Sequence, residues 1–458
     1  METETDVVVI GLGVGGEQVA AELATAGLDV VGVEAELVGG ECPYWACIPS
    51  KMMVRAGNLL AEARRIPGMA GRSSVYPEWG PVADRIRDEA TDNWNDQVAV
   101  DRFTDKGGRF VRGHAQLIGP GRVEVAGETF NARRGVVLAT GSSPAIPPIP
   151  GLTDTPYWTN RQSISATELP TSLLVLGGGA VGVEQAQAFA RFGTAVTVIE
   201  AAERLLPAEE PEVGAMLADI LAAENLTVRT SARAQHVSHR GDTFTLTLDS
   251  GEELSAQHLL VATGRRPQLA GLGLDTIGLD PEARSVPVDE QMRAAPGVWA
   301  VGDLTGIGMF THVATYQAQI ATRNILDDPG PDADYKAIPR VTFTDPEIGS
   351  VGATEASARE HGISVRTAIT QIPASARGWI HKVGNHGLIK LVEDADRGVL
   401  VGATSAGPTG GEVLYGLAIA VQAEIPVDQL RHMIFAYPTF HRAVEDALSK
   451  LRPHTPAK

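Results

Sequence analysis

Apolar residues near the N-terminus fall into two short unbroken runs on either side of a helical stretch. Residues Val7 to Ile10 form the first run, which is long enough for a buried strand. A helical stretch follows to about Ala26 and is closed by Gly27. The second run, from Asp29 to Val33, ends in Glu34. Because neither run alternates apolar with polar residues, the pattern predicts two buried parallel strands joined by a helix.

The same pattern recurs in the middle of the chain. An apolar run from Leu173 to Leu176 leads into a glycine-rich turn and a helical stretch that Gly193 closes. A further run from Ala195 to Ile199 is followed by Glu200. The spacing from the first glycine of the turn to the acid is the same in both copies. This internal repeat predicts two units of similar plan.

Each unit carries the pattern G-x-G-x-x-G between its first strand and its helix. The glycines are Gly11, Gly13 and Gly16 in the first copy and Gly177, Gly179 and Gly182 in the second. Glycines allow a tight turn and a close approach to a pyrophosphate, and the helix N-terminus offers free N–H groups. The acid that follows can accept a hydrogen bond from a ribose hydroxyl. A turn without a ligand is the alternative, but the complete context favours two dinucleotide sites.

A second repeated signal lies downstream of each fingerprint. One buried run ends in Thr140 and Gly141, and another ends in Gly264. In the second copy, Glu200 would accept from a ribose 2′-hydroxyl and repel a 2′-phosphate, which favours NADH over NADPH. The nearby Arg204 leaves NADPH open.

Proline-rich segments mark the joints between these units. Pro144 to Gly151 cannot form a regular helix or a central strand and is interpreted as a linker. Asp327 to Asp334 is interpreted as another linker. Beyond it, a strand-like run at Arg340 to Phe343 and a helical stretch at Gly411 to Ala423 indicate an α+β module. The helices between about Ile66 and Thr104 are not placed by the pattern.

Composition narrows the class of protein. The chain has 458 residues, enough for about three domains. It carries 38 Lys and Arg against 56 Asp and Glu, a formal charge of −18, which argues against nucleic acid as a partner. It has no apolar run long enough to span a membrane. Its acidic N-terminus does not resemble a signal peptide, so we expect a cytoplasmic protein.

The chain has only two cysteines, Cys42 and Cys47. A protein of this size does not need a disulfide to hold its core together. A disulfide between these two would close a short loop and add little stability. Two buried thiols without chemistry are the alternative, but the sequence around them favours a redox pair.

The segment Gly39 to Lys51 reads GGECPYWACIPSK. It resembles the redox signature of the pyridine nucleotide-disulfide oxidoreductases, the family of dihydrolipoyl dehydrogenase, glutathione reductase and mercuric reductase. In that family two cysteines are separated by four residues and followed by Ile-Pro-Ser/Thr-Lys, as Cys42 and Cys47 are here. Further matches run along the chain. They are Ala139–Gly141, Ala262–Pro267, Ala300–Asp303 and Phe343–Glu347.

The resemblance implies a glutathione-reductase-like α/β fold, with two Rossmann-type dinucleotide-binding domains and a C-terminal α+β dimerisation domain. The FAD-binding domain would be split between residues 1–150 and 270–335. The NAD(P)-binding domain would cover residues 151–269, and the dimerisation domain residues 336–458. The resemblance also implies a homodimer in which the Tyr437 segment lies over the cysteines of the other subunit.

The resemblance assigns roles to individual residues. Cys47 would lie against the flavin of FAD, and Cys42 would be the thiol that meets the substrate. Lys51 and Glu184 match an ion pair near flavin N5, with a solvated helix carboxylate as the alternative for Glu184. Asp303 would face the ribityl chain of FAD.

The C-terminal motif departs from the family pattern. Tyr437 stands where most members have a catalytic histidine, and Arg442 stands where they have its glutamate partner. Mercuric reductase also has a tyrosine there, but it captures metal with a C-terminal cysteine pair that this chain lacks. His441 and Glu445 would share a face of a helix. They could be a relocated acid–base pair, a surface pair or part of the dimer contact.

The insert between the cysteines also departs from the family, because it contains Tyr44 and Trp45. These aromatic residues either restrict the acceptor to planar or small molecules or pack within the fold. Three functions follow as alternatives. The first is reduction of a small disulfide by NAD(P)H through FAD and the cysteines. The second is reduction of quinones, dyes or metal ions, without a resident metal site. The third is a redox sensor without catalysis.

Overall fold

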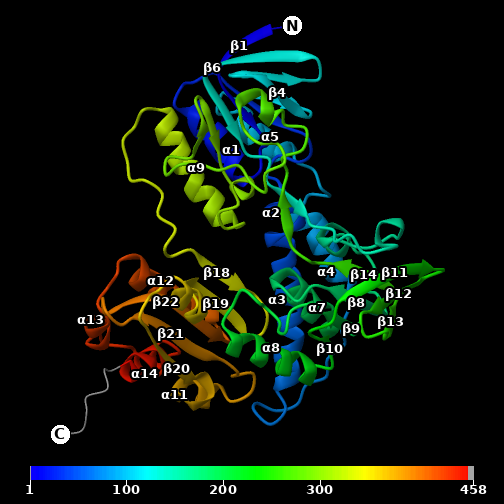
Figure 1. Ribbon diagram of the computed structural model, residues 1–458. Coiled ribbons are helices and arrows are strands. Elements are labelled where there is room, and N and C mark those ends of the chain that lie inside the picture. The colour runs from blue at the N-terminus through cyan, green and yellow to red at the C-terminus, as the bar shows by residue number, and fades with distance from the viewer. Residues whose placement is uncertain (1, 452–458) are drawn as a thin grey trace. The chain divides into compact units, whose positions relative to one another are not determined.

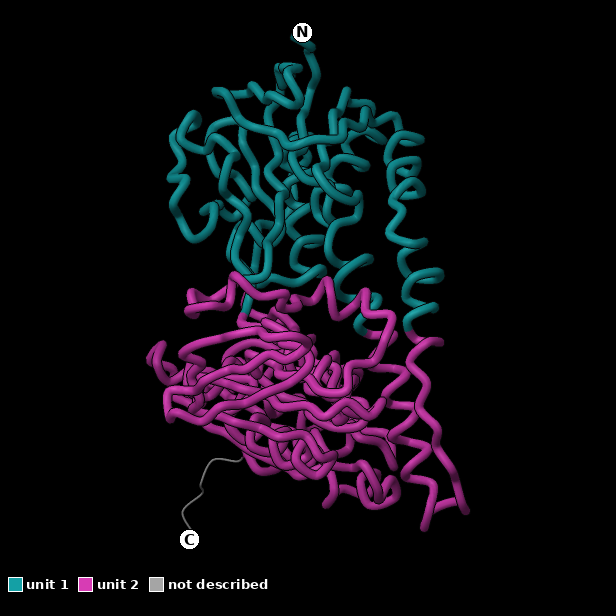
Figure 2. Tube along the Cα trace, turned by 90° about the vertical axis from the view of Figure 1, so that its right-hand side faces the viewer, with its two compact units in different colours: residues 1–50, 83–145, 264–334 teal, residues 51–82, 146–263, 335–458 magenta. Residues whose placement is uncertain are grey.

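The computed structural model describes residues 2–451, which form two compact units. Figure 2 colours unit 1 teal and unit 2 magenta. Unit 1 comprises residues 1–50, 83–145 and 264–334, and unit 2 comprises residues 51–82, 146–263 and 335–458. The chain therefore crosses from one unit to the other several times, and segments that are distant in the sequence share a core.

Unit 1 is built on a sheet whose central strands run parallel in the order β17-β6-β1-β2-β3. Residues Val7 to Val9 of β1 are fully buried, which explains why their run does not alternate. Helix α1 follows β1 directly and packs beside α9 (Figure 1). The bounds are β1 Glu2–Ile10, α1 Val14–Thr25, β2 Val30–Glu34, β3 Arg109–Arg112, β6 Glu128–Leu138, β17 Val298–Ala300 and α9 Thr311–Ile325.

Smaller elements of unit 1 surround this sheet. An antiparallel hairpin, β4 and β5, pairs with the inner strand β6, and β16 pairs with β17 and forms one edge of the sheet. Short strands β7 and β15 pair with each other. The bounds are α2 Glu41–Trp45, a π-helix Ile86–Ala90, α5 Gln97–Thr104, β4 Ala115–Gly119, β5 Arg122–Val125, β7 Ser142–Pro144, β15 Arg265–Pro267 and β16 Arg293–Ala295.

Unit 2 contains the second copy of the repeat. Its four-stranded parallel sheet has the order β10-β9-β8-β14, and a three-stranded antiparallel sheet, β11 to β13, lies between β10 and β14 in the chain. The bounds of this part are β8 Ser172–Leu176, α7 Ala180–Phe192, β9 Ala195–Ile199, α8 Pro211–Ala223, β10 Thr227–Arg229, β11 Ala234–Arg240, β12 Thr243–Leu248, β13 Glu253–Ala256 and β14 His258–Val261. Helix α6 Asn160–Ile164 precedes it, and helices α3 Cys47–Arg65 and α4 Gly80–Arg85 each contain a boundary between the two units in the sequence.

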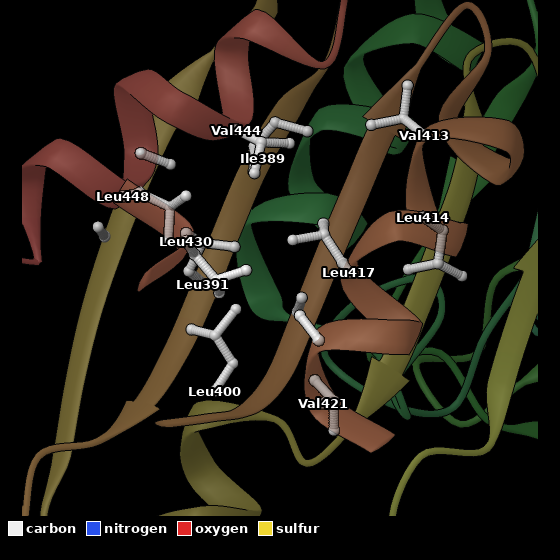
Figure 3. Packing of buried hydrophobic residues seen from close by; sticks show 14 of the residues in the cluster. Ile389, Leu391, Leu400, Val413, Leu414, Leu417, Val421, Leu430, Val444 and Leu448 are labelled. Atoms are coloured by element: carbon white, nitrogen blue, oxygen red, sulfur yellow. The ribbon is translucent and has the colours of Figure 1, made fainter. Parts of the chain in front are cut away.

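The C-terminal part of unit 2 is an antiparallel sheet in the order β18-β19-β22-β21-β20. Helices α12 and α14 cover it, and their apolar residues interlock with those of β21 and β22 (Figure 3). This module therefore has its own core, as the change of pattern predicted. The bounds are β18 Pro339–Thr342, β19 Glu347–Gly352, α10 Glu355–Glu360, β20 Val365–Gln371, α11 Ala376–His381, β21 Leu388–Asp394, β22 Val399–Gly407, α12 Gly410–Gln422, α13 Val427–Arg431 and α14 Arg442–Lys450.

Candidate functional site

The first glycine fingerprint forms the turn between β1 and α1. Gly11 has a φ of +92°, a conformation that residues with a side chain rarely adopt. A side chain at Gly16 would overlap the carbonyl oxygen of Gly11. Gly13 is the N-cap of α1 and provides no side chain to satisfy the free N–H groups of the helix. These backbone N–H groups therefore remain available to an anion such as a pyrophosphate.

The second fingerprint repeats this geometry between β8 and α7. Gly177 has a φ of +111°, and a side chain at Gly182 would overlap the Gly177 carbonyl oxygen. Gly179 is the N-cap of α7, and no heavy atom lies within 4 Å of the position that its side chain would take. An open space beside a helix N-terminus fits the phosphates of a second dinucleotide.

The two acids make equivalent contacts with the two fingerprints. Glu34 accepts hydrogen bonds from the backbone N–H groups of Leu12 and Glu36, at 2.7 and 2.8 Å. Glu200 accepts from those of Gly178 and Ala202, both at 2.7 Å. Burial raises the pKa of the Glu34 carboxyl, although both backbone donors oppose the shift. Each acid is thus fixed beside its glycine turn, where a ribose would lie.

The two cysteines lie at the starts of two consecutive helices. Cys42 lies in α2, and Cys47 is the first residue of α3. They are not joined by a disulfide, and the Cys47 Sγ lies 3.4 Å from the Thr311 Oγ1 at the start of α9. The pKa of the Cys42 thiol is raised, first by its hydrogen bond to Cys47 and then by burial. The Cys42 thiol therefore keeps its proton.

Lys51 and Glu184 form an ion pair within unit 2. The Lys51 Nζ lies 2.7 Å from the Glu184 Oε2 and 4.8 Å from the centre of the Phe343 ring. The other carboxylate oxygen of Glu184 accepts from the backbone N–H of Phe343 at 2.8 Å. Glu184 is only 5% exposed, so it is not a solvated helix carboxylate.

Asp303 belongs to a polar cluster that sequence reasoning described only in part. The Ser142 Oγ donates to Asp303 at 2.5 Å. Arg265 in turn donates to the Oγ and the carbonyl oxygen of Ser142, at 2.8 and 2.7 Å. Ser142 and Arg265 directly follow Gly141 and Gly264, the glycines that end the repeated strand pattern. This repeat could therefore have identified both residues from the sequence. Thr311 had no comparable local signal.

The aromatic insert packs within unit 1. Tyr44 is buried, and burial raises the pKa of its hydroxyl. The Trp45 ring stacks on Trp94, with 5.2 Å between ring centroids and 21° between ring planes. Trp94 has a left-handed φ of +56° and follows the π-helix Ile86–Ala90. Tryptophan rarely adopts this backbone conformation, and the sequence pattern did not indicate Trp94 as part of the site.

The C-terminal motif differs from the expected arrangement. Tyr437 is 71% exposed. His441 precedes α14 as its N-cap, and Glu445 forms an ion pair with Arg442 at 2.6 Å. His441 has helical backbone angles, φ −60° and ψ −27°, so it lies about one turn before Glu445, and a relocated acid–base pair of these two residues stays a prediction. The final residues of the chain, 452–458, lie outside the described residues.

Two further findings concern residues 2–451 alone. No group of three or more His, Cys, Asp or Glu side chains is arranged to hold a metal ion. In this part of the chain, no helix has both the length and the apolar character needed to cross a membrane.

Two family models together cover most of the chain. The model of the pyridine nucleotide-disulphide oxidoreductases matches residues 5–318. The model of the dimerisation domain of the same family matches residues 338–448. The chain therefore belongs to the pyridine nucleotide-disulphide oxidoreductase family.

Individual relatives are similar over nearly their whole length. A mercuric reductase of Streptomyces lividans is 35% identical, covering 97% of this chain and 95% of the relative. A dihydrolipoyl dehydrogenase of Thermus scotoductus is 34% identical, covering 97% of each. Among solved structures, LpdA of Mycobacterium tuberculosis matches with a TM-score of 0.86 and 27% identity, covering 98% of this chain and 100% of that one. The flavoprotein disulfide reductase RclA of Escherichia coli, as a Cu(II) complex, also matches with a TM-score of 0.86, at 26% identity over 98% and 100% of the two chains.

These similarities confirm several expectations from the sequence. The fold is glutathione-reductase-like, and the protein is a flavoprotein oxidoreductase that uses FAD and NAD(P)H. The reading as a non-catalytic sensor is therefore set aside. The dimerisation domain supports a homodimer.

Proposed function

We propose that the protein passes reducing equivalents from NADH, through FAD, to the Cys42–Cys47 pair and then to a small acceptor. One observation carries the proposal: the two thiols are in hydrogen-bonding contact, and the Cys47 Sγ also lies beside Thr311. A structural pair of thiols would not need a hydroxyl partner at this position. When bound, FAD supplies two-electron transfer between the nicotinamide and the disulfide.

The cysteines and the ion pair take separate roles in this proposal. Reduction breaks the disulfide and leaves Cys47 as the thiolate and Cys42 as the thiol. In the order that the family resemblance assigns, Cys42 then gives up its proton and attacks the disulfide of the acceptor, which releases one thiolate. Cys47 attacks the resulting mixed disulfide at Cys42, which releases the second thiolate and restores the Cys42–Cys47 disulfide. The buried Glu184 holds the ammonium group of Lys51 in place, which suits the role near flavin N5 that the family resemblance assigns to this ion pair.

We assign the second fingerprint to NADH rather than NADPH. Glu200 is held in place by two backbone N–H groups, so it cannot turn away from a 2′-phosphate without losing both hydrogen bonds. A fixed carboxylate beside a phosphate is repulsive, and it accepts well from a 2′-hydroxyl.

The acceptor is proposed to be a small disulfide, with a quinone, dye or metal ion as the second candidate class. Tyr437 replaces the family's histidine, and a tyrosine hydroxyl gives and takes protons less readily than an imidazole at neutral pH. This substitution favours acceptors that do not need a histidine acid. The names of the relatives include mercuric reductases and a Cu(II) complex, which keeps metal ions among the second class.

An anaerobic titration of the purified flavoprotein with NADH tests the central step. We expect a long-wavelength absorbance band of the Cys47 thiolate against the oxidised flavin after the addition of two electrons. Cys42→Ser should show this band without reduction, and Cys47→Ser should never show it. If both variants behave as the wild type does, the cysteines are not the redox pair.

A screen of acceptors with two variants tests the second step. We expect slow reduction of glutathione disulfide and lipoamide, alongside measurable NADH oxidation with quinones or dyes. Tyr437→His alone should restore little disulfide reduction, because Arg442 occupies the place of the partner glutamate. Tyr437→His with Arg442→Glu should raise it by about 10²–10⁴-fold, the usual span of general acid–base catalysis. Rapid turnover of a common disulfide by the wild type would contradict this reading and make His441→Ala the next variant.

A further inference from the structure

The segment that follows β9 carries the residues that bear on nucleotide choice. Residues 200–210, which we call the nucleotide loop, include Glu200 and Arg204 and connect β9 to α8. The loop contains no helix or strand, so no regular backbone ladder holds it. Its position therefore depends on the contacts that it makes with its surroundings.

At its inner side the nucleotide loop lies against the second fingerprint. Glu200 accepts from the Gly178 N–H at 2.7 Å, and the Leu206 N–H donates to the Gly178 carbonyl oxygen at 3.0 Å. Leu205 is fully buried, and a side chain at Gly178 would come within 2.6 Å of its Cδ2. A shift of the loop would therefore move the glycine turn as well.

At its outer side the nucleotide loop is held by the C-terminal sheet. Both oxygens of Glu209 accept from Arg340 of β18, at 2.6 and 3.0 Å. The next residue, Glu210, forms an ion pair with Lys390 of β21 at 2.8 Å. The other oxygen of Glu210 accepts from the backbone N–H of Glu355 at 2.7 Å. Two consecutive residues of the loop are thus bound to three elements of the C-terminal module.

Lys390 is the most deeply buried part of this attachment. It is 2% exposed, and its ammonium group also lies 2.9 Å from Glu212 and 3.1 Å from Glu355. Burial by itself would lower the pKa of Lys390, but the hydrogen bonds that its ammonium group donates to three carboxylates outweigh burial and raise the pKa. Apolar residues in such a place are often as stabilising as buried ion pairs. The charged hydrogen bonds of Lys390 are directional, so they give the nucleotide loop a defined geometry.

We infer that Arg340 and Lys390 are positioning residues for the pyridine nucleotide: they fix the nucleotide loop from the C-terminal module and thereby set the affinity for NADH. This inference rests on the proposed assignment of the second fingerprint to NADH. The physical path runs from Arg340 and Lys390, through Glu209 and Glu210, to Leu206 and the glycine turn. Neither basic residue touches the fingerprint itself, so each acts through the loop.

The test compares Arg340→Met and Lys390→Met with Arg366→Met in the holoenzyme. Arg366 is the matched control, because it is a half-buried arginine of β20 that pairs with the buried Glu393 of β21 at 2.8 Å, on the same sheet but away from the loop. The rate of flavin reduction, followed anaerobically against NADH concentration, separates the apparent affinity for NADH from the maximal rate. Flavin absorbance and the melting temperature report whether each variant is folded.

We expect Arg340→Met and Lys390→Met to weaken the apparent affinity for NADH by roughly 2- to 30-fold, the span of couplings carried through neighbouring residues. The maximal rate of flavin reduction and the flavin content should stay close to those of the wild type. Arg340→Lys, which retains the charge but not the paired hydrogen bonds, should recover part of the affinity. Arg366→Met should leave the affinity unchanged.

The inference is overturned if folded Arg340→Met binds NADH as the wild type does, or if Arg366→Met weakens binding as much. If Lys390→Met does not fold, Arg340→Met alone decides between these results. A wild-type flavin that neither NADH nor NADPH reduces would instead refute the proposed function, which distinguishes the two failures.

Discussion

The two glycine fingerprints have nearly the same internal geometry but differ in what lies over them. In both copies the segment after the acid bonds to the middle residue of the turn: the Gly39 N–H donates to the Leu12 carbonyl oxygen at 2.7 Å, and the Leu206 N–H donates to the Gly178 carbonyl oxygen at 3.0 Å. In the first copy this segment also lies against the N-cap, since a side chain at Gly40 would come within 2.8 Å of the Gly13 Cα. The chain therefore folds back across the N-terminus of α1. In the second copy, the space beside Gly179 is open.

The covering segment of the first copy leads directly to the redox pair, since α2 begins at Glu41. A fingerprint covered by its own chain suits a cofactor that stays bound, such as FAD. An open fingerprint suits a nucleotide that must enter and leave in every turnover, such as NADH. The same local motif thus suits a retained FAD in one unit and an exchanging NADH in the other. The difference lies in the residues that follow the acid of each fingerprint.

The largest expected effect comes from disturbing the covering segment. Gly40 has a φ of +71°, and the nearest atom to an added side chain would be the Gly13 Cα. A backbone atom cannot move aside as the end of a flexible side chain can. Gly40→Ala should cost about 1–3 kcal/mol from backbone strain alone. We expect the purified variant to lose most of its FAD, as measured by flavin absorbance per chain. Full retention of FAD would mean that the covering segment does not secure the cofactor.

The same substitution in both N-caps tests the comparison directly. Gly13 and Gly179 have φ values of −65° and −76°, so alanine fits the backbone at either position. The added methyl group would point toward the phosphates. Gly13→Ala should weaken FAD binding without changing the affinity for NADH. Gly179→Ala should raise the KM for NADH by about tenfold, equivalent to about 1.4 kcal/mol, with unchanged flavin content.

The measurement is flavin content and the NADH dependence of the rate in both variants side by side. If Gly179→Ala lost flavin while Gly13→Ala raised the KM for NADH, the assignment of the two sites would be reversed. Equal effects of both variants on both quantities would show that the two sites are not independent.

The smallest expected effect concerns the choice between nucleotides. Glu200→Gln removes the negative charge and keeps an oxygen for the Gly178 N–H. The ratio of kcat/KM for NADPH to that for NADH should rise roughly fivefold, about 1 kcal/mol of removed repulsion. Glu34→Gln is the matched control and should leave this ratio unchanged. An unchanged ratio in Glu200→Gln would remove Glu200 as the discriminating residue.

Much of the fold was predictable because strong local signals mark it. The strand runs at 7–10 and 173–176, the two glycine turns and the proline-rich linker at 144–151 all lie where the pattern predicted. Short polar helices carry weaker signals. The segment between residues 66 and 104 therefore stayed unplaced, although it contains α4, a π-helix and α5.

The C-terminal motif shows what spacing leaves open. His441 stands at the N-cap of α14 with helical backbone angles, so it lies about one turn before Glu445. The ion-pair partner of Glu445 is Arg442, because residues three apart in a helix are also neighbours. Spacing within the motif named the neighbours of Glu445 but not the one with which it pairs.

The sequence by itself determined the class of chemistry, since the spacing of Cys42 and Cys47 and the repeated glycine turns are local properties. Only the tertiary structure decided which distant side chains support them. Thr311 meets Cys47, and Arg340 holds Glu209, across more than a hundred positions of the chain in each case. Such contacts depend on how whole helices and strands pack against one another. Periodicity and spacing within one segment do not determine that packing.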